Sequence, residues 1–228
     1  MSLACHTCPV RDRAACSVLD DEDREALART GRTRDLKRGE LLFAAGDESI
    51  ACATLVSGAL KVSSLDEDGV ERILALIHPA GFVGELFAPF AEHDVYALTD
   101  SRVCLFGRSH LDRAIDDHPA LGRALLRRSQ EDLHESRRML ELSGRKTAAD
   151  RVGGLLLELA RAASDSPCHP AARFDLPLTR GEMASLLGMT IETVSRSLTA
   201  FARSGAIRKH GARGIELLDP ARLGKPAP

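Results

Sequence analysis

The chain has no hydrophobic run long enough to cross a membrane. Its 228 residues contain no stretch of about 18 consecutive apolar side chains, the length that a transmembrane helix needs. Residues 1–13 also lack the apolar centre of a secretory signal peptide. These absences exclude a helical membrane protein, and we expect a soluble, cytoplasmic protein.

Enzyme motifs are also missing. The sequence holds no glycine-rich phosphate loop, no nucleophile elbow and no convincing acid–base constellation, so we do not expect an enzyme. The net charge of -2 does not by itself indicate a nucleic-acid partner. The charge is uneven, however: residues 173–214 contain seven Lys or Arg against three Asp or Glu, which makes this end of the chain locally basic.

Six cysteines are present, and in a reducing compartment they indicate metal binding, redox sensing or packing before disulfides. Cys5, Cys8 and Cys16 lie in a polar segment without apolar periodicity, which we do not expect to be a core element. Gaps of two and seven residues allow three thiolates to reach one metal. A fourth ligand is then needed, and spacing does not choose among His6, Cys52, Cys104 and Cys168. The alternative is reduced surface thiols in a loose tail.

Residues 32–106 have the pattern of antiparallel β-structure. Short apolar or alternating runs occur at 41–43, 54–57, 60–63, 72–77 and 103–106, with glycines between them. This pattern predicts a small β-barrel or jelly roll with a hairpin tip at 66–69. Short helices are expected before it, capped by Asp20, and after it, capped by Ser109.

A long helix is predicted from about Pro119 to Arg145. Steps of three and four residues place one narrow stripe along it, suited to pairing with the same helix of a second copy. The stripe is weak because leucine alternates with serine, so a modest outside bias could separate the pair. Its positions are Leu126, Ser129, Leu133, Ser136, Leu140 and Ser143. The alternative is an ordinary amphipathic helix packed on its own domain.

The last third of the chain predicts a winged helix-turn-helix. After a helix at 147–163 and a linker at 164–173, a strand ends at Leu178, and Thr179 caps a short helix at 180–187. A glycine turn follows, and Thr190 caps a second helix through residue 203. The apolar side of that helix leaves four residues free to read bases: Glu192, Ser195, Arg196 and Thr199.

A hairpin at 207–218 would form the wing, with several basic residues near phosphate: Arg208, Lys209, His210 and Arg213. The alternative is a protein-interaction module with a solvated polar face, which the agreement of caps, turn and apolar positions disfavours.

These segments together resemble the CRP/FNR family of bacterial transcription regulators. The resemblance rests on the run TIETVSR at 190–196, which follows LTRGE at 178–182. It implies an α+β fold with an antiparallel β-roll (jelly roll) sensor, a long dimerisation helix and a C-terminal winged helix-turn-helix. The implied boundaries are 1–18 for a cysteine-rich tail, 19–116 for the sensor, 117–145 for the dimerisation helix and 146–228 for the DNA-binding domain.

The same resemblance implies a homodimer that binds TTGAT-like palindromes in double-stranded promoter DNA and contacts RNA polymerase. The implied DNA-binding residues are Thr179, Arg180, Thr190, Glu192, Ser195 and Arg196.

The resemblance also implies a role for the cysteines. FNR-type oxygen sensors are similar in having three clustered N-terminal cysteines and a fourth near the end of the roll. The matching residues are Cys5, Cys8, Cys16 and Cys104, which would hold one 4Fe-4S cluster per subunit. Cys52 and Cys168 are then not ligands. Loss of the cluster to oxygen would separate the weakly paired subunits, although Ser136 stands where an acidic residue opposes pairing in such sensors.

Two further motifs bear on whether the chain is an iron-sulfur oxygen sensor and on whether it binds a cyclic nucleotide. The run GRKTA at 144–148 is similar to FixK regulators, which typically lack the N-terminal cysteines. A FixK-like regulator, or a zinc or thiol-redox regulator of the same family without an iron-sulfur cluster, is therefore the alternative. Gly84 and Glu85 resemble the turn that holds a cyclic nucleotide, but residues 93–96 lack the expected arginine and serine, so no cyclic nucleotide is expected.

Overall fold

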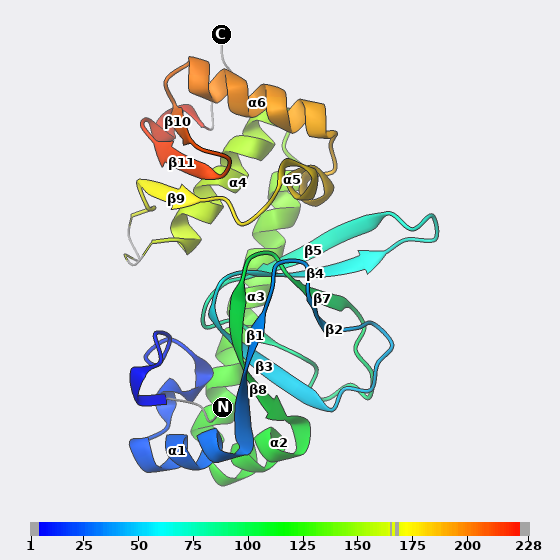
Figure 1. Cartoon of the computed structure of the whole chain (residues 1–228), viewed down its shortest axis with the longest axis vertical. Coiled ribbons are helices and arrows are strands. Elements are labelled where there is room, and N and C mark those ends of the chain that lie inside the picture. The colour runs from blue at the N-terminus through cyan, green and yellow to red at the C-terminus, as the bar shows by residue number, and fades with distance from the viewer. Residues whose placement is uncertain (1–4, 165, 167–168, 224–228) are drawn as a thin grey trace. The chain divides into compact units, whose positions relative to one another are not determined.

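The computed structural model describes residues 5–164, 166 and 169–223. The chain forms two compact units, Met1–Glu135 and Ser136–Pro228, and the long helix is divided between them (Figure 1). No helix in the described part is long and apolar enough to span a membrane.

The first unit is built on two four-stranded antiparallel sheets. One has the order β1 (Gly31–Leu36), β8 (Ser101–Gly107), β3 (Ala51–Ser57) and β6 (Phe82–Val83). The other has the order β2 (Leu41–Phe43), β7 (Asp94–Ala97), β4 (Leu60–Leu65) and β5 (Glu71–Ile77). The predicted β-roll and its five strands are confirmed, while β1, β6 and β7 carry too short or too polar a pattern to be recognised from sequence.

The predicted hairpin tip is also present, between β4 and β5. Asp66 accepts hydrogen bonds from the backbone N–H groups of Asp68 and Val70, at 3.2 and 2.9 Å. Gly69 has a φ of 76°, a backbone conformation that glycine adopts without strain. The turn therefore forms from local chemistry alone.

The N-terminal segment is packed, contrary to the sequence prediction. It contains two 3-10 helices, η1 (Cys5–Thr7) and η2 (Ala15–Val18). Between them, Val10 and Ala14 are buried against Val56 and Ala80 of the roll. The prediction was wrong because two small apolar side chains four residues apart suffice to fill a small hollow, and so short a pattern has no measurable periodicity.

Three helices complete this unit and lead out of it: α1 (Asp21–Thr30), α2 (Arg108–Asp117) and α3 (Pro119–Ser143). Asp20 caps α1 as predicted, accepting from the backbone N–H of Asp23 at 2.9 Å. Ser109 does not cap α2. Strand β8 runs directly into that helix, so the cap position falls on Gly107, which provides no side-chain hydrogen bond.

The second unit combines helices with a small sheet. Its helices are α4 (Ala148–Ala162), α5 (Arg180–Leu187) and α6 (Ile191–Arg203), and its strands are β9 (Arg173–Asp175), β10 (Ile207–His210) and β11 (Gly214–Leu217), in the order β10-β11-β9. A last 3-10 helix, η3, spans Pro220–Arg222. The helices and wing are confirmed. The expected strand ends at Asp175 rather than Leu178, which is buried outside the sheet.

Close packing of α4 against Leu223, the residue that follows η3, generates a stability prediction. A methyl group added at Gly153 would collide with the backbone carbonyl of Leu223, which cannot move as a flexible side chain would. We expect Gly153→Ala to lower the free energy of unfolding of the second unit by about 1–3 kcal/mol. Urea denaturation followed by circular dichroism measures this.

Gly181→Ala is the matched control, because the nearest atom to its added methyl is Ile191 Cδ1 at 3.7 Å, an ordinary contact. It should leave stability unchanged or raise it by up to about 1 kcal/mol, since alanine favours helix more than glycine does. Equal effects of the two substitutions would contradict this packing argument.

Candidate cysteine site and nucleic-acid interface

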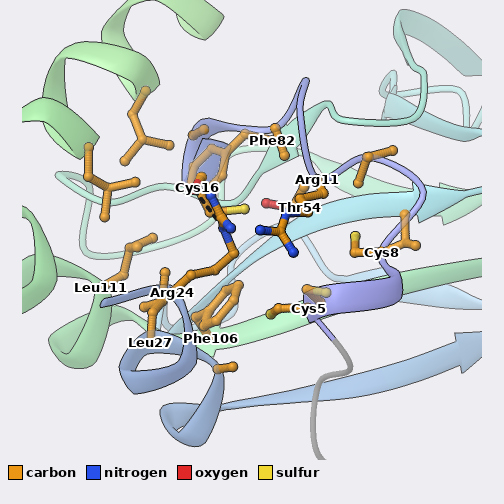
Figure 2. Close-up of a pocket in the computed structure, with 18 residues that line it drawn as sticks. Cys5, Cys8, Arg11, Cys16, Arg24, Leu27, Thr54, Phe82, Phe106 and Leu111 are labelled. Carbon is orange, nitrogen blue, oxygen red and sulfur yellow. Dashed lines mark hydrogen bonds between the residues drawn. The ribbon is translucent and has the colours of Figure 1, made fainter. Parts of the chain in front are cut away.

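Four cysteines line one small, largely apolar cavity of about 40 Å³ in the first unit (Figure 2). Cys5 lies in η1, Cys8 directly after it, Cys16 in η2, and Cys104 in the middle of β8. On β8, Cys104 is paired across the sheet with Thr33 of β1 and Thr54 of β3. The structure thus brings together the three clustered cysteines and one of the four candidates for a fourth ligand.

The other candidates do not join this cavity in the described part of the chain. His6 is exposed, and Cys52 is fully buried beside Leu111 and Leu121 without lining the cavity. Cys168 lies outside the described residues. All five described cysteines are free thiols.

The cavity disfavours negative charge on the thiols. Burial, followed by repulsion from the neighbouring Cys8, Cys5 and Cys16, raises the pKa of Cys104 to about 12. Burial and the other thiols also raise the pKa of Cys5 and of Cys16. A cationic inorganic centre would reverse this balance, because it binds the thiolate form. The donor set therefore fits a thiolate-ligated metal group.

The distances between the cysteine sulfurs bear on the kind of metal group that they could bind. Within the described residues, three metal-ligating atoms lie within 4.8 Å of one another only at Glu85, Glu92 and His93, and not among the cysteines. Four sulfurs around one tetrahedral zinc ion would be separated by about 3.8 Å. The cysteine sulfurs of the described residues therefore do not form a ready-made closed zinc site.

A second cavity, of about 630 Å³, lies in the roll where the resemblance places a cyclic nucleotide. Its lining carries five acidic or imidazole groups: Asp47, Glu48, Glu85, His93 and Asp132. Of its two arginines, Arg34 is paired with Glu40 at 3.0 Å. Glu85 itself accepts a hydrogen bond from the backbone of Glu92 at 2.9 Å. This acidic lining is poorly suited to a cyclic phosphate.

The helix-turn-helix is organised by reciprocal caps. Thr179 accepts from the backbone N–H of Glu182 at 3.1 Å, and the Glu182 carboxylate accepts from that of Thr179 at 2.6 Å. Gly188 ends α5 in the left-handed region, with a φ of 61°, and Thr190 caps α6. The predicted apolar residues Val194, Leu198 and Phe201 are buried.

The opposite side of α6 presents polar groups. Glu192 and Arg196 are exposed, and Ser195 is partly so. Arg180 at the start of α5 donates to Ser195 Oγ at 3.4 Å, which joins the two helices on this face. The backbone N–H of Glu192 and the Thr190 hydroxyl lower the pKa of Glu192, so its carboxylate stays an acceptor. These groups suit contacts with base edges in a major groove.

The wing contributes one basic residue to this face. Lys209 Nζ lies 3.5 Å from Thr199 Oγ1 of α6, and burial, followed by repulsion from Arg180, lowers the pKa of Lys209. Sequence reasoning placed Lys209 only in the wing, since nothing in the sequence shows that β10 passes beside α6. Arg208 and His210 instead share the carboxylate of Glu216, at 3.0 and 2.8 Å.

The predicted pairing stripe on α3 remains uncovered in the single chain. Leu126, Leu133 and Leu140 are 64%, 49% and 73% exposed. Ser129 is exposed and Ser136 partly so. Three solvent-facing leucines at seven-residue spacing are a pattern that favours helix pairing.

A β-roll, a long helix and a winged helix-turn-helix with a basic reading face define a class of DNA-binding transcription regulators. Residues 33–118 match the cyclic nucleotide-binding domain, and residues 150–225 match the Crp-like helix-turn-helix domain. The chain belongs to the CRP/FNR family of transcription regulators.

Known relatives align over most of the chain. The transcriptional activator protein FnrL of Cereibacter sphaeroides is 35% identical over 96% of this chain and 90% of its own length. The nitrogen fixation regulation protein FixK of Bradyrhizobium diazoefficiens is 31% identical over 96% and 92%. The structure of FixK2 from Bradyrhizobium japonicum has a TM-score of 0.75 at 29% identity, covering 85% of this chain and 95% of that one.

The position of Lys209 generates a prediction for DNA binding. A lysine that faces phosphate contributes to affinity for all sequences through counterion release. We expect Lys209→Ala to weaken binding to every DNA duplex to a similar degree and to reduce the slope of log K against log salt by about 1. Fluorescence anisotropy at several salt concentrations measures both quantities.

Arg203→Ala is the control, since Arg203 is also exposed and basic but lies at the far end of α6. It should leave the slope unchanged. A loss confined to one DNA sequence, or the same loss in both variants, would contradict the phosphate role of Lys209.

Proposed function

We propose that this chain is an oxygen-responsive transcription regulator that dimerises and binds TTGAT-like palindromes while Cys5, Cys8, Cys16 and Cys104 hold a 4Fe-4S cluster. The observation that carries the proposal is the convergence of these four thiols on one cavity from two distant parts of the chain. When bound, the cluster supplies a link between the N-terminal segment and the roll that oxygen destroys. No cyclic nucleotide takes part, in keeping with the acidic lining of the roll cavity.

The residues around the cysteines offer a route from this site to α3. Val10 and Ala14 pack on Ala80, the one non-glycine residue of the described chain with a positive φ, at 78°. Two residues earlier, His78 Nε2 lies 3.3 Å from the Glu135 carboxylate of α3. Gly81 of the same loop lies next to Arg128 of α3. Ordering the N-terminal segment therefore fixes a loop that contacts the long helix directly.

The stripe on α3 then pairs with that of a second copy. Leucine at alternate positions gives a seam with a small free energy of association, because the intervening Ser129 and Ser136 bury little apolar surface. A palindrome whose half-sites are one DNA turn apart would then be read by two α6 helices, one from each chain. We assign base contacts to Glu192, Ser195 and Arg196, with Thr179, Arg180 and Thr190 beside them, and infer that the bound dimer contacts RNA polymerase in the cytoplasm.

Protein purified without air tests the cofactor. We expect a brown protein with visible absorbance and about four iron and four sulfide per chain, which decays as air enters. Cys104→Ser should lose most of the iron, because it removes one of four ligands. Cys52→Ser, the control, removes a buried thiol that does not line the cavity and should retain the iron.

The same preparation separates the alternatives. A colourless protein loaded with zinc would indicate a zinc or thiol-redox regulator, and a metal-free protein that binds DNA in air would indicate a FixK-like one. Equal iron loss in the Cys104 and Cys52 variants would contradict the assignment of the fourth ligand.

The weak seam generates a separate prediction. Replacing Ser136 with leucine adds one apolar side chain per subunit at a pairing position, each contributing about 1.5–3 kcal/mol when buried. We expect Ser136→Leu to tighten the dimer at least about tenfold and to permit DNA binding in air. Analytical ultracentrifugation and aerobic DNA binding measure these outcomes.

His134→Leu is the matched control, because His134 is exposed on α3 but outside the stripe. It should change neither quantity. Unchanged oxygen dependence in Ser136→Leu would count against the seam.

A further inference from the structure

Arg24 of α1 is the only buried arginine among the described residues, with 7% of its surface exposed. It lines the cysteine cavity, and its side chain reaches toward Cys16 in Figure 2. A charge in such a place needs full hydrogen bonding to offset the cost of burial. Its partners therefore indicate what it does.

The guanidinium binds the backbone of the segment that carries Cys16. Its Nε donates to the Cys16 carbonyl at 3.2 Å, and its Nη2 donates to the Leu19 carbonyl at 2.6 Å and the Ser17 carbonyl at 3.4 Å. These carbonyls lie at the C-terminal end of η2, where the Cys16 carbonyl also accepts from the backbone N–H of Leu19 at 3.2 Å. A planar fork with five N–H donors can serve all three at once, whereas an ammonium group cannot hold the same geometry.

The Arg24 guanidinium also places a positive charge at the cysteine cavity. It lines the same cavity as the four cysteines and hydrogen-bonds the Cys16 backbone, so its charge lies next to the thiols. Asp21 accepts from both Arg24 and the cavity residue Arg11, so the two arginines are held beside the cavity by one carboxylate. Four thiolates around an iron-sulfur core leave a net negative charge, which a fixed neighbouring cation stabilises.

We infer that Arg24 is a positioning residue for the cysteine site: it fixes the Cys16 backbone through three carbonyls and sets the reduction potential of the bound cluster through its charge. This inference rests on the proposed function. It concerns a residue outside the four ligands and separates into a hydrogen-bonding part and an electrostatic part, which two substitutions distinguish.

Arg24→Met removes both parts, and Arg24→Lys keeps the charge while losing the fork. In full-length protein prepared without air, we expect Arg24→Met to have a more negative midpoint potential and at least about tenfold faster iron loss in air. Arg24→Lys should keep the potential of the natural protein, while its backbone amides at residues 15–19 exchange hydrogen at least about tenfold faster. Redox titration and amide hydrogen exchange give the two readouts.

Arg29→Met is the matched control, because Arg29 lies on the same helix but is exposed. It should match the natural protein in both measurements. The inference would be overturned if Arg24→Met had the same midpoint potential, the same rate of iron loss in air and the same amide hydrogen exchange as the natural protein. If Arg24→Met holds no iron, restored iron and potential in Arg24→Lys support the inference, and their absence in Arg24→Lys overturns the electrostatic part.

The proposed iron-sulfur function and the role of Arg24 are refuted by different results. A natural protein without iron-sulfur absorbance would refute the proposed function, whatever the Arg24 variants do. Amide exchange in iron-free protein still tests the hydrogen-bonding part, because the three carbonyl contacts need no cofactor. Exchange at residues 15–19 that is equal in iron-free natural protein and Arg24→Met would refute that part alone.

Discussion

The first unit depends on the antiparallel pairing of β8 between β1 and β3. This pairing places Cys104 at the centre of a sheet, where its position is set by hydrogen bonds on both sides. The same strand runs without a connecting loop into α2, and from there the chain reaches α3 after one residue. A cysteine held this rigidly can act as a fixed anchor, to which the N-terminal segment brings the other three thiols.

The cavity brings together thiols whose charged forms repel one another and a buried arginine, Arg24, whose positive charge offsets part of that repulsion. Burial, followed by repulsion from neighbouring thiols, raises the pKa of Cys5, Cys16 and Cys104, which favours their neutral forms when no cation is bound. Arg24 opposes this effect while it satisfies the backbone carbonyls of η2. The site is thus unfavourable for bare thiolates, and the proposed cluster would supply the positive charge that stabilises them.

The two units obtain their order in different ways. The helix-turn-helix relies on contacts between residues close in sequence, such as the Thr179–Glu182 capping box and the left-handed Gly188. The cysteine site relies on contacts between residues about 90 positions apart, such as Cys16 and Cys104. In the proposed regulation, oxygen removes the link between the N-terminal segment and the roll. This fits the difference between the units, because the distant contacts can be released while the locally ordered DNA-binding unit stays folded.

The sequence by itself determined most of the helices, caps and turns, because residues such as Asp20, Thr179 and Thr190 act on backbone groups within three positions. The predicted Ser109 cap failed because β8 continues directly into α2. The alternating runs also predicted most of the roll. The spacing of the cysteines left Cys104 and Cys52 equivalent, the family resemblance pointed to Cys104, and the tertiary structure places Cys104 on the cavity of the three clustered cysteines. Only the tertiary structure packed Val10 and Ala14 into the roll and brought Lys209 to α6. These outcomes depend on which distant segments meet, and a contact between distant segments leaves no periodic trace in either one.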